Sequence, residues 1–211
     1  MDLEYLEMVS SSYKLSFTTG GLFLAESVRV VDEYVQLFDW GETIKLARRQ
    51  NLLQTRTASS GDRMLWEVCS RLRMLTPTQL ALLQSGSSTD QKQLLWVAAC
   101  KHYEVLRDFG NEVIRGKFLR LDRVVAADDF DEFLESKAIW HPEIEKLTEK
   151  TRAKLRQVGL RMLREADILS SELEIQPTAF SPAVARAIQT DSVAYFDIFP
   201  VSEDVLRRAL A

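Results

Sequence analysis

The apolar residues between positions 148 and 169 recur at steps of three and four, which is the spacing of an amphipathic helix. The residues that this spacing places on one face are Leu155, Val158, Gly159, Met162, Leu163 and Ala166. Thr148 or Thr151 can cap the start, because a hydroxyl there accepts a hydrogen bond from a free amide of the first turn. We therefore predict one long helix with a buried face.

The opposite face of this predicted helix carries almost one sign of charge. It holds Lys150, Lys154, Gln157, Arg161 and Arg164, and Arg152 and Arg156 lie on its flank. Residues 146–164 contain seven bases and a single acid, Glu149. Helices that need only solubility usually mix signs so that pairs form along the surface. The face therefore indicates an acidic partner, and the alternative is a solvated helix face.

Helical patterns fill most of the remaining chain. They cover residues 22–37, 42–50, 59–75, 77–84, 90–106, 108–118, 128–138, 182–188 and 202–210, with a short helix opening at Pro142. Only residues 172–177 alternate as a strand does. Helices joined by short loops predict an all-α fold. We place a boundary between two helical parts, residues 1–124 and 125–211, because a basic run gives way to an acidic run near this point.

The totals bound the class of protein. The 211 residues carry a net charge of −4, so any affinity for polyanions must come from local basic blocks. Cys69 and Cys100 lie in apolar helical patterns, which indicates buried free thiols and a reducing compartment. The longest apolar run, residues 94–100, is far below the roughly 20 residues that a membrane helix needs. The first eight residues do not have the pattern of a signal peptide, so we expect a cytoplasmic protein.

The order of elements in the second half resembles a winged helix-turn-helix. Residues 142–147 would be the supporting helix, residues 148–165 the recognition helix and residues 172–177 a wing strand. A second wing strand is not evident, and Glu172 and Glu174 in a wing would repel phosphate.

A second basic constellation precedes the helix predicted from Ser59 or Ser60. Its candidate contact residues are Arg56, Thr57, Ser59, Ser60 and Arg63. The free amides and positive end of a helix start, with hydroxyls and arginines beside them, can hold a phosphate. The alternative is a plain N-cap with an arginine nearby.

The residues do not assemble a catalytic or metal site on paper. His102 and His141 lie in no nucleophile motif, and the two cysteines and two histidines are not at metal-ligand spacing. The acids at 128–132 lack the pattern of a calcium loop, and residues 18–21 lack the lysine of a phosphate-binding loop. We expect no enzyme activity, cofactor, metal or small-molecule substrate. Trp40, Trp66, Trp96 and Trp140 are interpreted as core or loop-anchoring groups.

Long blocks of the chain resemble the BrxA family, a small component of bacterial BREX phage-exclusion systems. They are SFTTGGL (16–22), NLLQTRTASS (51–60), LLWVAACKHYEVLRDF (94–109), KFLRLD (117–122), KAIWHPEIEKL (137–147) and TRAKLRQVGLRMLREADIL (151–169). The resemblance implies a non-enzymatic protein of two helical bundles, the first similar to the NusB antitermination fold. It also implies binding of duplex DNA.

Together these observations predict a cytoplasmic accessory protein that binds duplex DNA mainly through phosphates. Little sequence specificity is expected, with Gln157 and Arg161 the pair best suited to read bases. One alternative is an adaptor whose basic face docks another BREX protein, such as a methyltransferase or an ATPase. Another, from the likeness to NusB, is RNA binding, although the basic stretches hold few aromatic residues for stacking.

Overall fold

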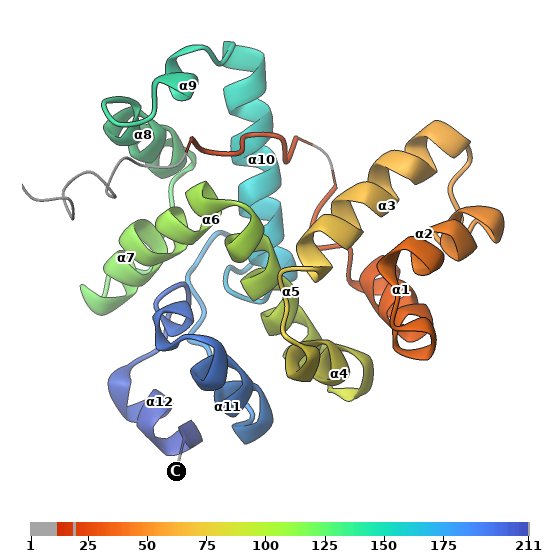
Figure 1. The fold of residues 1–211 in the computed structure, drawn as a ribbon. Helices are drawn as coiled ribbons and strands as arrows, with labels where there is room; N and C mark the ends of the chain where they lie inside the picture. Colours follow the sequence, from red (N-terminus) through yellow and green to blue (C-terminus); the bar gives the residue numbers. More distant parts are fainter. Residues whose placement is uncertain (1–11, 19, 211) are drawn as a thin grey trace, which may run out of the picture.

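Helices form almost all of the regular structure in the computed structural model, which describes residues 12–18 and 20–210 (Figure 1). The all-α prediction is confirmed. The first half contains α1 (Leu24–Leu37), α2 (Trp40–Arg49), α3 (Ala58–Leu72), α4 (Pro77–Ser85) and α5 (Ser88–His102). The second half contains α6 (Glu104–Asp108), a π-helix (Phe109–Arg115), α7 (Gly116–Leu119), α8 (Ala127–Ala138), α9 (Pro142–Glu145), α10 (Glu149–Glu165), α11 (Pro182–Asp191), a 3-10 helix (Val193–Phe196) and α12 (Glu203–Leu210).

Capping residues set several helix starts. The Thr76 hydroxyl accepts from the Gln79 amide at 3.2 Å, and the Gln79 side chain accepts from the Thr76 amide at 3.0 Å. Pro77 occupies the first position of α4, where a missing amide proton costs no helical bond. Ser87 and Asp90 cap α5 in the same reciprocal way, so α5 begins two residues before its predicted start.

Helix α5 lies at the centre of the molecule and contacts α1, α3, α4 and α10. Every side chain from residue 93 to residue 100 is buried, so α5 has no solvent face along two turns. A helix that is apolar all round belongs inside a protein. The Trp96 indole also donates a hydrogen bond of 3.1 Å to the carbonyl of Ile198, which joins α5 to the C-terminal part of the chain.

The predicted helix over residues 90–106 breaks earlier, at Tyr103. This residue has an extended backbone, and its hydroxyl donates to the Glu67 carboxylate of α3 at 2.6 Å. From Glu104 the chain continues through α6, the π-helix and α7 as one helical segment. Gly110 lies within the π-helix where an added Cβ would be 3.2 Å from the Ile198 carbonyl oxygen. The absence of a side chain at Gly110 therefore allows the C-terminal chain to approach closely.

An irregular segment near the N-terminus crosses the molecule in front of α10 in Figure 1; we call residues 12–18 and 20–22 the crossing segment. The Tyr13 ring stacks on His141 with centroids 3.5 Å apart, and its hydroxyl donates to Asp108 at 2.6 Å. Phe17 packs against Tyr103 at 5.0 Å. The crossing segment therefore ties the α8–α9 turn and α6 to the helices of the first half.

The predicted strand at residues 172–177 is wrong as a regular strand. Its residues make two isolated antiparallel bridges instead, Leu169 with Ile175 and Val124 with Glu174. The Ile175 amide donates to the Arg123 carbonyl at 2.7 Å, and the Val125 amide donates to the Leu173 carbonyl at 3.0 Å. Residues 123–125, just before α8, therefore pair with this segment in the place where a wing would have its second strand.

One cluster of buried side chains extends from Tyr13 to Val201 and includes residues of both predicted bundles. The division after residue 124 stays a prediction. Within residues 12–18 and 20–210, none of the helices is long and apolar enough to cross a membrane.

Candidate nucleic-acid interface

Helix α10 begins and packs as its sequence predicts. The Thr148 hydroxyl accepts from the Thr151 amide at 3.2 Å, so Thr148 is the capping residue. The side chains predicted to face the core are buried, namely Leu155, Val158, Gly159, Met162, Leu163 and Ala166. Gly159 lies against α8, because an added Cβ would be 3.2 Å from the Phe130 ring. This packing fixes which face of α10 is turned to solvent.

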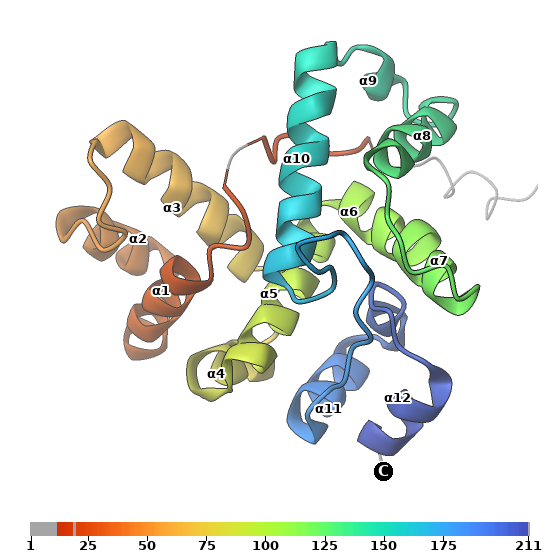
Figure 2. The same cartoon turned by 180° about the vertical axis from the view of Figure 1, so that it is seen from behind.

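The exposed face of α10 carries the predicted basic stripe. Its members are Lys150, Lys154, Gln157, Arg161 and Arg164, and all five are exposed. At about 1.5 Å per residue, the stripe is about 21 Å long. Figure 2 shows α10 at the front of the molecule, turned away from the crossing segment, which passes behind it. We refer to these five residues as the α10 stripe.

The charges at the N-terminal end of the α10 stripe are not neutralised by neighbouring carboxylates. Within the part of the chain that the structure describes, neither Lys150 nor Lys154 forms an ion pair. The Lys154 ammonium donates to the Gln157 side chain at 2.9 Å, which leaves the charge itself unneutralised. Neighbouring charges of one sign raise the local concentration of an oppositely charged ligand.

Arg152 and Arg156 lie on the flank of α10 and are half-buried, with their guanidinium groups already engaged. Arg152 donates to the Ile144 carbonyl of α9 at 3.0 Å. Arg156 forms an ion pair with Asp131 of α8. These two arginines therefore hold α10 against α8 and α9, and their predicted contact with DNA remains untested.

The C-terminal end of the α10 stripe contacts the crossing segment. Arg161 donates to the Glu165 carboxylate at 2.7 Å, and the same carboxylate accepts from the Leu22 amide at 2.6 Å. An added Cβ on Gly21 would lie 2.1 Å from a Glu165 oxygen. A glycine at this position therefore lets the carboxylate reach the backbone of the crossing segment.

An open cleft of about 590 Å³ lies beside this contact. It is lined by side chains of α10, α3, α5 and the start of α1, including Arg161, Arg164, Met64 and Lys92. Lys92 forms an ion pair of 2.7 Å with Asp167 at the end of α10. The cleft brings α3 and the last turns of α10 to one surface, although the two predicted basic sites lie on separate helices.

The start of α3 differs from its prediction. Thr57 is the capping residue, with its hydroxyl accepting from the Ser60 amide at 3.2 Å, so the prediction of Ser59 or Ser60 is wrong. The helix begins at Ala58 because Thr57 has the extended backbone of an N-cap. The Ser60 hydroxyl accepts from the Thr57 hydroxyl at 2.9 Å, so both groups are partly satisfied within the protein.

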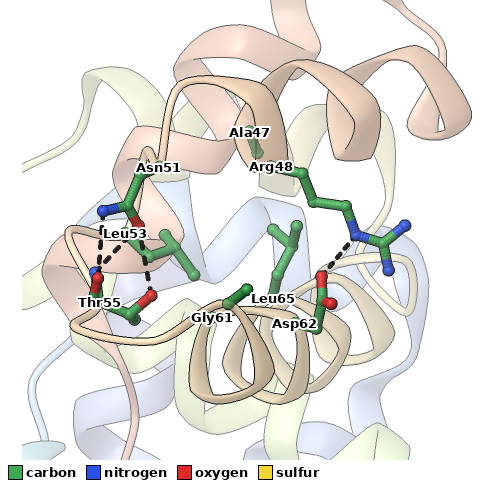
Figure 3. A pocket seen from close by; sticks show the side chains of 9 residues that line it. Ala47, Arg48, Asn51, Leu53, Thr55, Gly61, Asp62 and Leu65 are labelled. Atoms are coloured by element: carbon green, nitrogen blue, oxygen red, sulfur yellow. Dashed lines mark hydrogen bonds and ion pairs between the residues drawn. The ribbon is translucent and has the colours of Figure 1, made fainter.

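Both arginines of this second basic site are exposed. Arg56 and Arg63 form no ion pair with any carboxylate that the structure places. A small pocket of about 190 Å³ lies between α2 and α3 (Figure 3). The ion pair of Arg48 with Asp62, 2.7 Å long, closes one side of it, and hydrogen bonds between Asn51 and Thr55 close the other.

The described residues contain no group of three or more side chains that could hold a metal ion. Cys69 and Cys100 are buried free thiols, as predicted. Burial raises the pKa of Cys69 to about 11 and raises the pKa of Cys100 well above its usual value. Both sulfurs are therefore protonated and unreactive at neutral pH.

The prediction that all four tryptophans are core or loop-anchoring groups is wrong for Trp66 and Trp140. Trp96 is fully buried, and Trp40 stacks on Tyr34 with centroids 4.0 Å apart. Trp66 on α3 is 58% exposed, however, and Trp140 after α8 is 73% exposed. Helical spacing could have shown this for Trp66, because it lies on the same face of α3 as Ser59, Arg63 and Ser70.

Comparison with known proteins agrees with this fold. The sequence model of the BrxA family matches residues 11–192. The protein named BREX protein BrxA from Escherichia coli O9:H4 (strain HS) is 27% identical over 152 residues, which cover 70% of each chain. The protein of the same name from Bacillus cereus (strain H3081.97) is 25% identical over 160 residues, covering 76% of this chain and 80% of that protein.

A solved structure has the same fold. The crystal structure of an uncharacterized protein from Magnetospirillum magneticum matches with a TM-score of 0.77 and 23% identity, over 90% of this chain and 98% of that chain. Because the family match extends over most of the chain, this protein belongs to the BrxA family.

Proposed function

We propose that this protein binds duplex DNA through phosphate contacts along the α10 stripe, as a non-enzymatic component of a BREX phage-defence system. The observation that carries the proposal is the alignment of Lys150, Lys154, Arg161 and Arg164 on one solvent-exposed face. Membership of the BrxA family supports the place in a BREX system, because relatives carry the name BREX protein BrxA.

Phosphate contact accounts for this surface better than base reading does. Lysine and arginine side chains contact phosphates without sequence information, and they bind by releasing counterions from the duplex. Gln157 is the only uncharged member of the α10 stripe, and its side chain is already bonded to Lys154. We therefore expect tight binding only at low salt and little preference among sequences.

The second anchor is the start of α3, with Arg56 and Arg63 as its unpaired cations. Thr57, Ser59 and Ser60 would add hydroxyl contacts to a neighbouring phosphate. Duplex held along α10 would extend past the shared cleft toward α3.

Fluorescence anisotropy of a labelled duplex over a salt series tests the proposal. The variant replaces Lys150, Lys154, Arg161 and Arg164 with Gln, which removes four charges and preserves helix propensity. Each phosphate contact contributes about 0.9 to the slope of log K against log salt. Because Arg161 already pairs with Glu165, the slope should fall by roughly 3, the value for the other three charges.

The matched control replaces Arg152 and Arg156 with Gln on the flank of the same helix. The control should lower thermal stability and leave most of the salt slope intact, because both side chains already have protein partners. A wild-type affinity that does not change with salt, or equal binding by the four-residue variant, would contradict the proposal.

An adaptor role is a second candidate, and the exposed turn after α8 favours it. Ile139 is 80% exposed and Trp140 is 73% exposed, an apolar pair of the kind that protein interfaces bury. Association with the BREX methyltransferase or ATPase that survives nuclease treatment and is lost in Trp140→Ala would support this role. Loss of the association on nuclease treatment would instead assign it to bridging DNA.

A further inference from the structure

Helix α3 presents an aromatic ring among its exposed polar residues. Ser59, Arg63, Trp66 and Ser70 follow one another at steps of four, three and four, so they share one face of the helix. The opposite face, with Leu65, Val68, Cys69 and Leu72, is buried. Trp66 is therefore attached to a well-packed helix while 58% of its surface remains in solvent.

The indole of Trp66 has one aromatic neighbour among the described residues. The His102 ring at the end of α5 meets it edge-on, with centroids 6.4 Å apart and an interplanar angle of 78°. His102 in turn packs edge-on against Tyr103 at 4.6 Å. These contacts help to fix the orientation of the indole, of which more than half remains exposed.

One exposed cation lies beside this ring. Arg63 is one helical turn before Trp66 on the same face. Arg63 forms no ion pair within the described part of the chain.

The acids of α3 are already neutralised. Asp62 pairs with Arg48 at 2.7 Å, and the buried Glu67 pairs with Arg71 at 2.5 Å. An exposed indole beside an uncompensated cation, without a free carboxylate on its helix, is complementary to a flat group that carries a phosphate. Single-stranded nucleic acid has this chemistry, and an acidic peptide lacks the flat group.

We propose that the exposed face of α3 binds a single-stranded nucleic acid by stacking one unpaired base on Trp66, with an adjacent phosphate held by Arg63. This proposal rests on the proposed function, in which the start of α3 is a second contact site for phosphates. It adds a base that binds to the same surface. Since every base has a flat face, the site tolerates any sequence. A paired base in a duplex cannot reach it, because both of its faces are covered by neighbours.

The experiment compares binding of labelled single strands of about 12 nucleotides, one of DNA and one of RNA with the same sequence, and of the corresponding DNA duplex. The variants are Trp66→Ala, Trp66→Phe and the matched control Trp140→Ala, which removes the other strongly exposed indole. Circular dichroism verifies that each variant is folded. The DNA and RNA arms identify which strand the site prefers.

Trp66→Ala should weaken single-strand binding by about 5- to 150-fold, the range that loss of one stacked base produces. Trp66→Phe should retain most of the affinity, and Trp140→Ala should match wild type. Arg63→Ala should reduce the salt slope by about 0.7, the value for one phosphate contact in a single strand. Equal single-strand binding by Trp66→Ala and Trp140→Ala would overturn the proposal, as would an equal loss on the duplex.

The two proposals fail separately. The four-residue variant of the α10 stripe tests duplex binding, and Trp66→Ala tests single-strand binding, in the same buffer. Trp66-dependent single-strand binding without any duplex binding rejects the proposed function and upholds this inference. Duplex binding that depends on the α10 stripe, with no wild-type affinity for single strands, upholds the proposed function and rejects this inference.

Discussion

The Arg71 guanidinium donates from two nitrogens to one carboxylate oxygen of Glu67, at 2.8 and 2.5 Å, in the interior of the molecule. The same oxygen accepts from the Tyr103 hydroxyl, and Arg71 also donates to the Gly21 carbonyl at 2.7 Å. This buried ion pair therefore links α3, the end of α5 and the crossing segment. A paired charge is tolerated inside a protein only while its partners remain.

Replacing Arg71 with Met should lower the free energy of unfolding by about 3–5 kcal/mol, because Glu67 would be left as an uncompensated buried carboxylate. Urea denaturation measures the loss. The double variant Arg71→Met/Glu67→Met should recover most of the stability, since it removes both charges. An equally unstable double variant would show that packing, and not charge, sets the cost.

Gly21→Ala should destabilise the protein by about 1–2 kcal/mol, because the new methyl group would displace the Glu165 carboxylate from the Leu22 amide. Thermal unfolding reports the change. In a Glu165→Ala background the same substitution should cost much less, which is the non-additivity expected for groups in contact. Equal costs in the two backgrounds would mean that the carboxylate is not the obstacle.

The two thiols should react with a disulfide reagent only when the protein unfolds. Burial raises the pKa of Cys69 to about 11 and raises that of Cys100 further above the usual range, so the thiolate is scarce and inaccessible at pH 7. Both cysteines should become titratable in denaturant. Rapid labelling of the native protein would contradict the burial of α3 and α5.

Acidification should destabilise the protein partly through His102. Burial lowers the pKa of His102, and the charges of Lys14 and Arg71 lower it further. The unfolded chain, with an ordinary imidazole pKa near 6.5, then binds the proton more readily than the folded protein does, so stability falls as pH drops through that value. His102→Gln should show a smaller fall in melting temperature between about pH 7.5 and pH 5.5 than wild type. Parallel curves for the two proteins would exclude this contribution.

Most of the helices were predictable because local signals define them. Thr148 located the start of α10 to within one residue, although the helix ends at Glu165, four residues before the predicted end, and Pro77 marked the start of α4. The capping residue of α3 was harder to predict. Three hydroxyl residues stand between Arg56 and Gly61, and only the backbone conformation of Thr57 selects among them.

The features of the fold that could not be predicted depend on contacts between residues far apart in the sequence. The break at Tyr103 depends on its hydrogen bond to Glu67 in another helix, and residues 123–125 find partners about fifty positions later. The α10 stripe followed from helical spacing alone. The engagement of Arg156 by Asp131 depends on a neighbour that no local pattern specifies.

The crossing segment can complete its contacts only late in the synthesis of the chain. Leu22 bonds to Glu165, which is 143 residues later in the chain. At about 5–20 residues per second, synthesis of that interval takes roughly 7–30 s. Leu22 must therefore wait for its partner on α10 through this whole interval, whereas Phe17 can meet Tyr103 earlier.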